Sequence, residues 1–247
     1  MKTNPLKLRL LLGGVALLLL DQVLHSPRAS HNTHHIREKF QIYKEPTQKK
    51  LASFIRKHGR SHQDSHRLAR SLKTIAGCFE IDAVLLTSLV TNESGWKKKA
   101  KSPTWAMGLT QFTSAGIREA SGQLRGDLWT RPETTRYLNN VINECVEPKL
   151  GIEWVQLWKR ARTIKEQKLL FLEDENLALV YGAVLLKTYV SIERFKNRYQ
   201  SLHYVITKGV SRYNGDNRKV KRQQRYVRVR DIYQQKVMSL AKSFAAR

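Results

Sequence analysis

Glu93 is the side chain in this sequence that is best placed for acid and base chemistry. It follows an apolar stripe at helical spacing, and Asp82 precedes that stripe where a helix N-cap is expected; the stripe consists of Leu85, Leu86, Leu89 and Val90. This spacing places Glu93 on the buried face of the predicted helix. Burial disfavours the charged form and raises a carboxyl pKa toward neutrality, where the group can hold and donate a proton. The competing interpretation is a helix-end glutamate that pairs with Lys97 or Lys98.

The residues after Glu93 predict a turn with small side chains and neutral hydrogen-bonding groups. The turn is kept slim by Ala106, Gly108 and Gly116, so that a bulky polymer can approach the backbone. Ser102 and Gln111 offer the donors and acceptors that carbohydrates require. Trp96 and Trp105 supply flat apolar surfaces, which suit either sugar rings or the protein core.

This pattern resembles the soluble lytic transglycosylase (SLT) domain, a family related to lysozyme. The family has E-S, then A-x-S, then G-A-x-G-L-M-Q, and the matching residues here are Ile81-Asp82, Leu85-Leu86, Glu93-Ser94, Ala100, Ser102, Ala106-Met107-Gly108-Leu109-Thr110-Gln111 and Ala115. The similarity continues through Gly182-Ala183 and Leu185-Leu186 to Tyr213-Asn214-Gly215 and Tyr226-Val227. It covers about residues 71–237. The chain departs from the family at Trp105, which replaces a glycine, at Thr110, which replaces a methionine, and at Phe112-Thr113-Ser114.

The resemblance implies a peptidoglycan lytic transglycosylase with an all-α, lysozyme-like fold. Glu93 would be its single catalytic acid/base, and the substrate-binding residues would be Ser102, Gly108, Gln111, Tyr213, Asn214 and Tyr226. Such an enzyme cleaves the β-1,4 bond between N-acetylmuramic acid and N-acetylglucosamine and leaves a 1,6-anhydromuramic end. The reaction requires neither a cofactor nor a metal.

Two other functions remain open. A second carboxylate that holds a water molecule would make the protein a lysozyme-type hydrolase, and Asp127, Glu144 and Glu147 are available for that role. The altered turn is also compatible with a non-catalytic protein that binds peptidoglycan or acts as the scaffold of an envelope machine. Retention of Glu93 and Gln111 favours an enzyme.

Helical spacing predominates after Ser71, in Val84–Val90 and again in Leu169–Val190, and it predicts a mainly helical fold. Alternation typical of a strand is confined to about Tyr226–Val229. Residues 1–24 are expected to be a signal peptide or membrane anchor, residues 25–70 a basic polar tether with surface helices, and residues 71–247 the catalytic domain. The histidines at four-residue spacing, His58, His62 and His66, suit a solvated helix face better than a metal site.

The N-terminus predicts export from the cytoplasm. Lys2, Lys7 and Arg9 precede an apolar run over Leu10–Leu20, whereas no good small-x-small cleavage site follows. The expected location is the periplasm or cell envelope, and a retained anchor in the inner membrane stays open beside a cleaved peptide. In that oxidising compartment Cys78 and Cys145 form either one disulfide or two separate buried thiols.

A net charge of +25 predicts polyanionic partners. The basic residues from Arg218 to Arg230, interleaved with tyrosines, would suit nucleic acid. Together with the leader they are better explained by peptidoglycan glycan strands, lipopolysaccharide or anionic membrane headgroups. The segment Gly116–Glu175 is expected to form a lid or a docking surface for an envelope-spanning complex.

Overall fold

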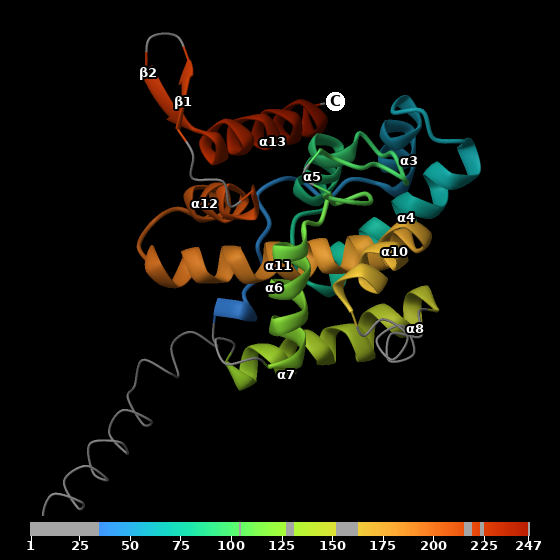
Figure 1. Ribbon diagram of the computed structural model, residues 1–247, viewed down its shortest axis with the longest axis horizontal. Coiled ribbons are helices and arrows are strands. Elements are labelled where there is room, and N and C mark those ends of the chain that lie inside the picture. Colours follow the sequence, from blue (N-terminus) through green and yellow to red (C-terminus); the bar gives the residue numbers. More distant parts are fainter. Residues whose placement is uncertain are drawn as a thin grey trace, which may run out of the picture.

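A long apolar helix, α11 (Glu175–Lys196), forms the centre of the protein (Figure 1). Its N-cap is Asp174, where the backbone turns extended after the preceding helix. The Asp174 carboxylate accepts hydrogen bonds from the Asn176 and Leu177 amides. The predicted helical run Leu169–Val190 is therefore broken at this position. Most side chains of α11 are buried because α4, α6, α10 and α12 contact it from different sides.

The computed structural model describes residues 35–103, 105–126, 131–151, 163–214, 219–222 and 225–246. The elements around α11 in chain order are α3 (Gln48–Lys57), α4 (His62–Cys78), α5 (Ala83–Ser94), α6 (Ser114–Arg125), α7 (Pro132–Val141), the π-helix η1 (Ile142–Val146), α8 (Glu147–Leu150), α10 (Ile164–Glu173), α12 (Leu202–Asn214), β1 (Lys219–Arg222), β2 (Arg225–Arg228) and α13 (Val229–Ala245). The predicted mainly helical fold is confirmed. The two strands form one antiparallel hairpin, in the region where alternation was expected.

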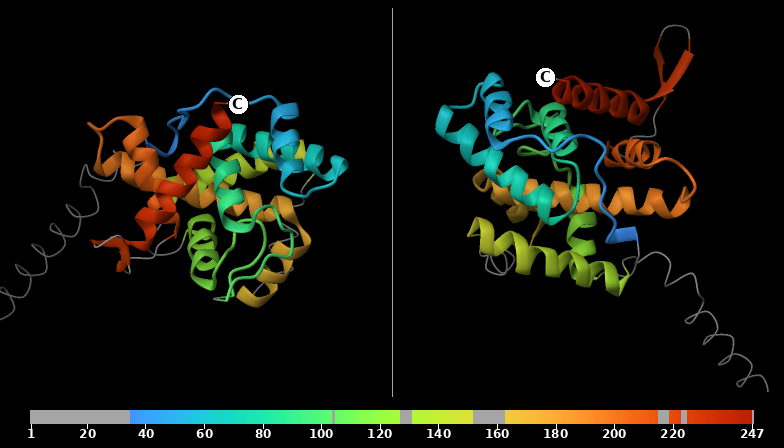
Figure 2. Two further views of the ribbon diagram at one scale, coloured as in Figure 1. Left: turned by 90° about the horizontal axis from the view of Figure 1, so that it is seen from above. Right: turned by 180° about the vertical axis from the view of Figure 1, so that it is seen from behind.

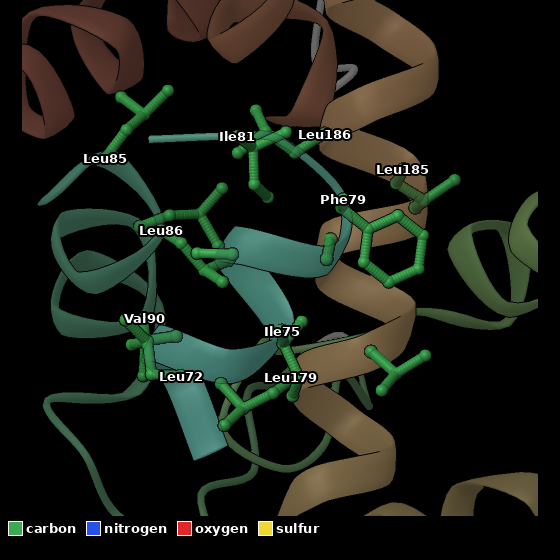
Figure 3. Packing of buried hydrophobic residues seen from close by; sticks show 14 of the residues in the cluster. Leu72, Ile75, Phe79, Ile81, Leu85, Leu86, Val90, Leu179, Leu185 and Leu186 are labelled. Carbon is green, nitrogen blue, oxygen red and sulfur yellow. The ribbon is translucent and has the colours of Figure 1, made fainter. Parts of the chain in front are cut away.

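Helix α5 lies in the core, and its first residue is fixed by the predicted cap. The Asp82 carboxylate accepts hydrogen bonds from the Val84 and Leu85 amides at 2.9 and 3.3 Å, and from Ile42 and Tyr43 at 2.9 and 2.7 Å. Burial raises the pKa of Asp82, and these four backbone donors oppose that effect. Figure 3 shows how side chains of α4, α5 and α11 interdigitate; among them are Leu72, Ile75, Leu86, Val90, Leu179 and Leu186. The helix that carries Glu93 is thus held from both ends and from its sides.

The described residues before position 71 belong to the same core, which corrects the expected boundary between residues 70 and 71. That boundary lies inside α4, and Leu68 and Ala69 are as fully buried as Leu72. Further upstream, Phe40 is buried and pairs with Ile81 in an isolated parallel bridge. Helix α3 has apolar residues at helical spacing that are buried against α4. The many basic residues between them made this pattern hard to recognise in the sequence. Residues 35–70 are therefore a packed layer of the fold and not a tether.

Cys78 and Cys145 form a disulfide with a Cα–Cα distance of 5.8 Å. It joins the last residue of α4 to η1, across a sequence separation of 67 residues. Of the two interpretations left open by the sequence, the structure has the bridge. It connects the α7–η1–α8 layer to the helix that packs against α5.

The C-terminal helix α13 packs on α5 and α12, as two further views show (Figure 2).

No helix in the described part of the chain is both long and apolar enough to cross a membrane. The predicted leader, residues 1–24, lies outside the described residues. Within the described ranges, no group of three or more His, Cys, Asp or Glu side chains could hold a metal ion. The rings of His62 and His66 are tilted by 50° to each other, with 4.5 Å between their centroids.

Candidate active site

Glu93 lies in a cleft of 540 Å³ formed where α5, the turn after it, α6, α11 and α12 meet. The cleft is lined by Glu93, Ser102, Ala106, Gln111, Phe112, Thr113, Ala115, Gly116, Glu119, Leu185, Tyr189, Arg212, Tyr213 and Asn214. Most of the predicted site residues are therefore brought together from distant parts of the sequence. The cleft is large enough for sugar rings rather than for a single small ion.

The carboxyl group of Glu93 is positioned by the end of α5. The helix stops at Gly95, which has a left-handed backbone conformation, so Glu93 occupies the last turn beside the cleft. Burial raises its pKa from 4.5 to about 7, and a hydrogen bond donated by Tyr233 opposes this rise. No described side chain forms an ion pair with Glu93, and the alternative pairing with Lys97 or Lys98 is not present. Near pH 7 the group is thus divided between an acid and its conjugate base.

Tyr233 was not predicted from the sequence. Its hydroxyl donates to Glu93 Oε1 at 2.5 Å, and burial and the nearby carboxylate raise the pKa of Tyr233 well above 10, so it remains a donor. A signal was available: Tyr233, Val237, Ala241 and Phe244 recur at helical spacing and form the buried face of α13. Because α13 packs on α5, this face brings the phenol to the carboxyl group.

The turn between α5 and α6 is built from its own hydrogen bonds. Ser102 Oγ accepts from the Ala106 amide at 3.0 Å, and Gln111 Nε2 donates to the carbonyls of Ala100 and Gly108 at 3.1 and 2.9 Å. Gly108 has a φ of +77°, and a Cβ there would come within 2.9 Å of a backbone oxygen of α10. Ser102 and Gln111 line the cleft as expected, whereas Gly108 does not and is required for the path of the backbone.

Thr110 packs away from the cleft, onto α11. It is fully buried, its hydroxyl donates to the Ala178 carbonyl at 3.1 Å, and its methyl group lies against Gly182. The residue that replaces the family's methionine therefore anchors the turn to the central helix. Its own carbonyl accepts from Tyr213 Oη at 3.4 Å, and burial next to Glu93 raises the pKa of Tyr213 well above 10.

The cleft is also lined by charged groups that the sequence did not single out, Glu119 and Arg212. Tyr189 on α11 donates to Glu119 Oε2 at 2.6 Å, and Arg212 on α12 pairs with the largely buried Glu193. Burial, followed by the effect of Glu119, raises the pKa of Tyr189 above its ordinary value. The Tyr189 and Tyr213 rings meet edge to face at 6.5 Å between centroids. These residues come from three helices, so no local motif could have grouped them.

The other residues named from the sequence lie in different parts of the protein or outside the described residues. Glu144 on η1 and Glu147 on α8 are not among the residues that line the cleft, whereas the exposed Glu119 is. Asp127 and the side chain of Tyr226 lie outside the described residues. Trp96 is a core residue with 1% exposure, and its indole donates to Thr91 Oγ1 at 2.9 Å.

Residues 72–147 match the family model of the transglycosylase SLT domain. Searches of curated proteins and of solved structures found no match. The matched residues contain Glu93 and the turn from Ser102 to Gln111, and they indicate a lytic transglycosylase that acts on peptidoglycan.

Proposed function

We propose that this chain, whose residues 72–147 match the family model of the transglycosylase SLT domain, cleaves peptidoglycan glycan strands by intramolecular transglycosylation with Glu93 as acid and base. The observation that carries the proposal is a carboxyl group with a pKa of about 7 in a 540 Å³ cleft whose described residues supply no ion-pair partner for it. A carboxyl group of this kind can serve both half-reactions near neutral pH. The bond cleaved is the β-1,4 linkage between N-acetylmuramic acid and N-acetylglucosamine.

In the first half-reaction, protonated Glu93 gives its proton to the bridging oxygen as the bond from the muramic C1 to that oxygen breaks. The N-acetyl group of the same sugar stabilises the positive charge at C1, so that no protein nucleophile is required. In the second half-reaction, the Glu93 carboxylate removes the proton of the C6 hydroxyl, and the C6 oxygen bonds to C1. The carboxyl group is regenerated, no water is consumed, and the product ends in a 1,6-anhydro ring.

The residues around Glu93 position its carboxyl group and contact the glycan. Tyr233 holds the Glu93 carboxylate by its hydrogen bond and limits the rise of its pKa. Ser102 and Gln111 shape the turn that lines part of the cleft, and Tyr213 and Asn214 line it from α12. These residues bind and orient the glycan.

The proposed location is the cell envelope, after export by the N-terminal leader. A disulfide is typical of oxidising compartments, and the Cys78–Cys145 bridge supports this location. The net charge of +25 favours binding to the anionic wall and to membrane headgroups. Anchoring to the inner membrane and assembly with an envelope-spanning complex are further parts of this proposal.

The first test is digestion of purified peptidoglycan by the unmodified protein, Glu93→Gln and a matched control, Glu144→Gln. Glu144 is an exposed carboxylate outside the cleft, so its replacement removes the same charge without changing the site. We expect Glu93→Gln to lose clearing activity and still sediment with peptidoglycan, and Glu144→Gln to remain active. Clearing by Glu93→Gln at the unmodified rate would contradict the proposal, and an inactive unmodified protein that only binds would favour the scaffold alternative.

A lysozyme-type hydrolase is the second candidate function, because Glu119 places another carboxylate in the same cleft. Such an enzyme would activate water, and its products would have reducing ends. Mass analysis of the released muropeptides separates the two reactions, since anhydro ends are lighter by one water molecule. A predominance of reducing ends, lost in Glu119→Gln, would establish the hydrolase.

A further inference from the structure

Trp105 is a large aromatic side chain that the fold leaves in water. Its exposed fraction is 67%, whereas that of Trp96, at the start of the same turn, is 1%. Tryptophan is highly buried on average, and it is enriched at binding interfaces. The contrast between the two tryptophans shows that this turn buries one ring for packing and presents the other.

The backbone at Trp105 is held in a conformation that suits glycine better than tryptophan. Its φ is +60°, in the left-handed region, where a Cβ is sterically unfavourable. Two contacts fix it there: its amide donates to the Ser102 carbonyl at 3.0 Å, and Lys168 Nζ on α10 donates to its carbonyl oxygen at 2.9 Å. This backbone strain is not offset by burial of the Trp105 side chain. Backbone strain that packing does not explain is characteristic of functional positions.

Trp105 does not itself line the cleft that contains Glu93, but it adjoins two residues that do. Ser102, which is bonded to the Trp105 amide, and Ala106, which follows it in the chain, both line that cleft. Lys101 and Lys168 add positive charge at the same edge. A flat apolar ring with basic neighbours beside this cleft suits a sugar ring whose strand carries acidic peptide stems.

We propose that Trp105 is a stacking platform for a sugar unit of the glycan strand beyond the cleaved bond, which makes binding depend on glycan length. The inference rests on the proposed function, because the ligand is the same polysaccharide. It assigns to this exposed side chain a contact that cleavage itself does not require. Strands that reach Trp105 gain the contact, and short fragments that fill only the cleft do not.

The test uses three substitutions that separate the ring from the backbone. Trp105→Gly removes the ring and relieves the left-handed strain, so we expect its thermal midpoint to be unchanged or raised by roughly 2–4 °C. Trp105→Phe keeps an aromatic face. The matched control is Tyr199→Ala, which removes an aromatic ring with 87% exposure from the connection between α11 and α12.

Binding is measured by calorimetry with chitotriose and chitohexaose, in a Glu93→Gln background that prevents turnover. We expect Trp105→Gly to weaken chitohexaose binding about fivefold to tenfold and to leave chitotriose binding unchanged. Trp105→Phe should retain most of the affinity for the hexamer, and Tyr199→Ala should retain all of it. Equal affinity of Trp105→Gly and its parent for chitohexaose overturns the proposal.

The same substitutions in the active protein keep the two proposals distinguishable. If the unmodified protein cleaves peptidoglycan and Trp105→Gly keeps the same preference for long strands over short fragments, the stacking proposal fails while the enzyme assignment stands. If the unmodified protein cleaves no glycan, the assigned reaction fails, and the hexamer measurement still decides whether Trp105 binds sugar.

Discussion

Replacing Glu93 by glutamine should stabilise the protein in a pH-dependent manner, because the fold holds this carboxyl group where its charged form is disfavoured. The pKa of Glu93 is raised from 4.5 to about 7. Between these values the unfolded chain loses the proton and the folded protein keeps it. The free energy of unfolding of the unmodified protein therefore falls as the pH rises through this window. Glutamine carries no charge in either state and avoids the penalty.

The magnitude follows from the two pKa values. A difference between 4.5 and about 7 corresponds to about 3 kcal/mol of lost stability at pH 8, and to only about 0.2 kcal/mol at pH 4, where both states are protonated. Glutamine can still accept the Tyr233 hydrogen bond, so little else changes in the site. We expect Glu93→Gln to exceed the unmodified protein by about 2–3 kcal/mol at pH 8 and to match it near pH 4.

The assay is urea unfolding followed by tryptophan fluorescence, at several pH values from 4 to 8. Glu144→Gln reports the effect of removing one negative charge from a basic protein. A stability difference between Glu93→Gln and the unmodified protein that does not change with pH would refute the argument that burial raises the carboxyl pKa. Activity tests the same titration, since kcat/KM should decline as the pH rises past about 7 and the proton donor is lost.

Three other outcomes follow from the structure. Tyr233→Phe removes a hydrogen bond that lowers the pKa of the Glu93 carboxyl group, so the alkaline limb of the pH–rate profile should move up by about one pH unit. An unchanged profile would argue against this contact. Gly209→Ala places a Cβ within 3.0 Å of the α11 backbone, so the free energy of unfolding measured in urea should fall by about 1–3 kcal/mol. Gly77→Ala is the control, because this helical position has no other atom within 4 Å of the added Cβ; its free energy of unfolding should rise by about 0.5–1 kcal/mol. Replacing Cys78 and Cys145 together by alanine should lower the free energy of unfolding by about 4 kcal/mol, because the disulfide that closes a loop of 67 residues in the unfolded chain is lost. A reductant should have a similar effect on the unmodified protein and no effect on the double variant.

Local patterns predicted the helix that carries Glu93 and the turn that follows it. Asp82 is the N-cap, the apolar stripe over Val84–Val90 is buried, and Ser102 and Gln111 reach the cleft as their positions in the motif suggested. These features depend on residues close in sequence, where capping and helical periodicity act.

Features that depend on packing between distant helices were missed. The N-terminal layer was interpreted as a tether because basic residues mask the buried stripe of α3, in which Leu51 and Ile55 are fully buried. Glu119 and Arg212 approach the cleft only through the arrangement of α6 and α12 around α11. Neither residue belongs to the family motif, although Arg212 directly precedes the predicted site residues Tyr213 and Asn214.

The part of the chain that matches the SLT family model cannot form the candidate active site by itself. Residues 72–147 supply Glu93 and the turn, but the hydroxyl that holds the carboxylate comes from Tyr233, and further lining residues come from α11 and α12. Without α11 and α13, the core-facing sides of α4 and α5 would be exposed to water, and burial could no longer raise the pKa of Glu93. The acid and base property of Glu93 therefore belongs to the assembled fold, although the glutamate itself can be found from a short motif.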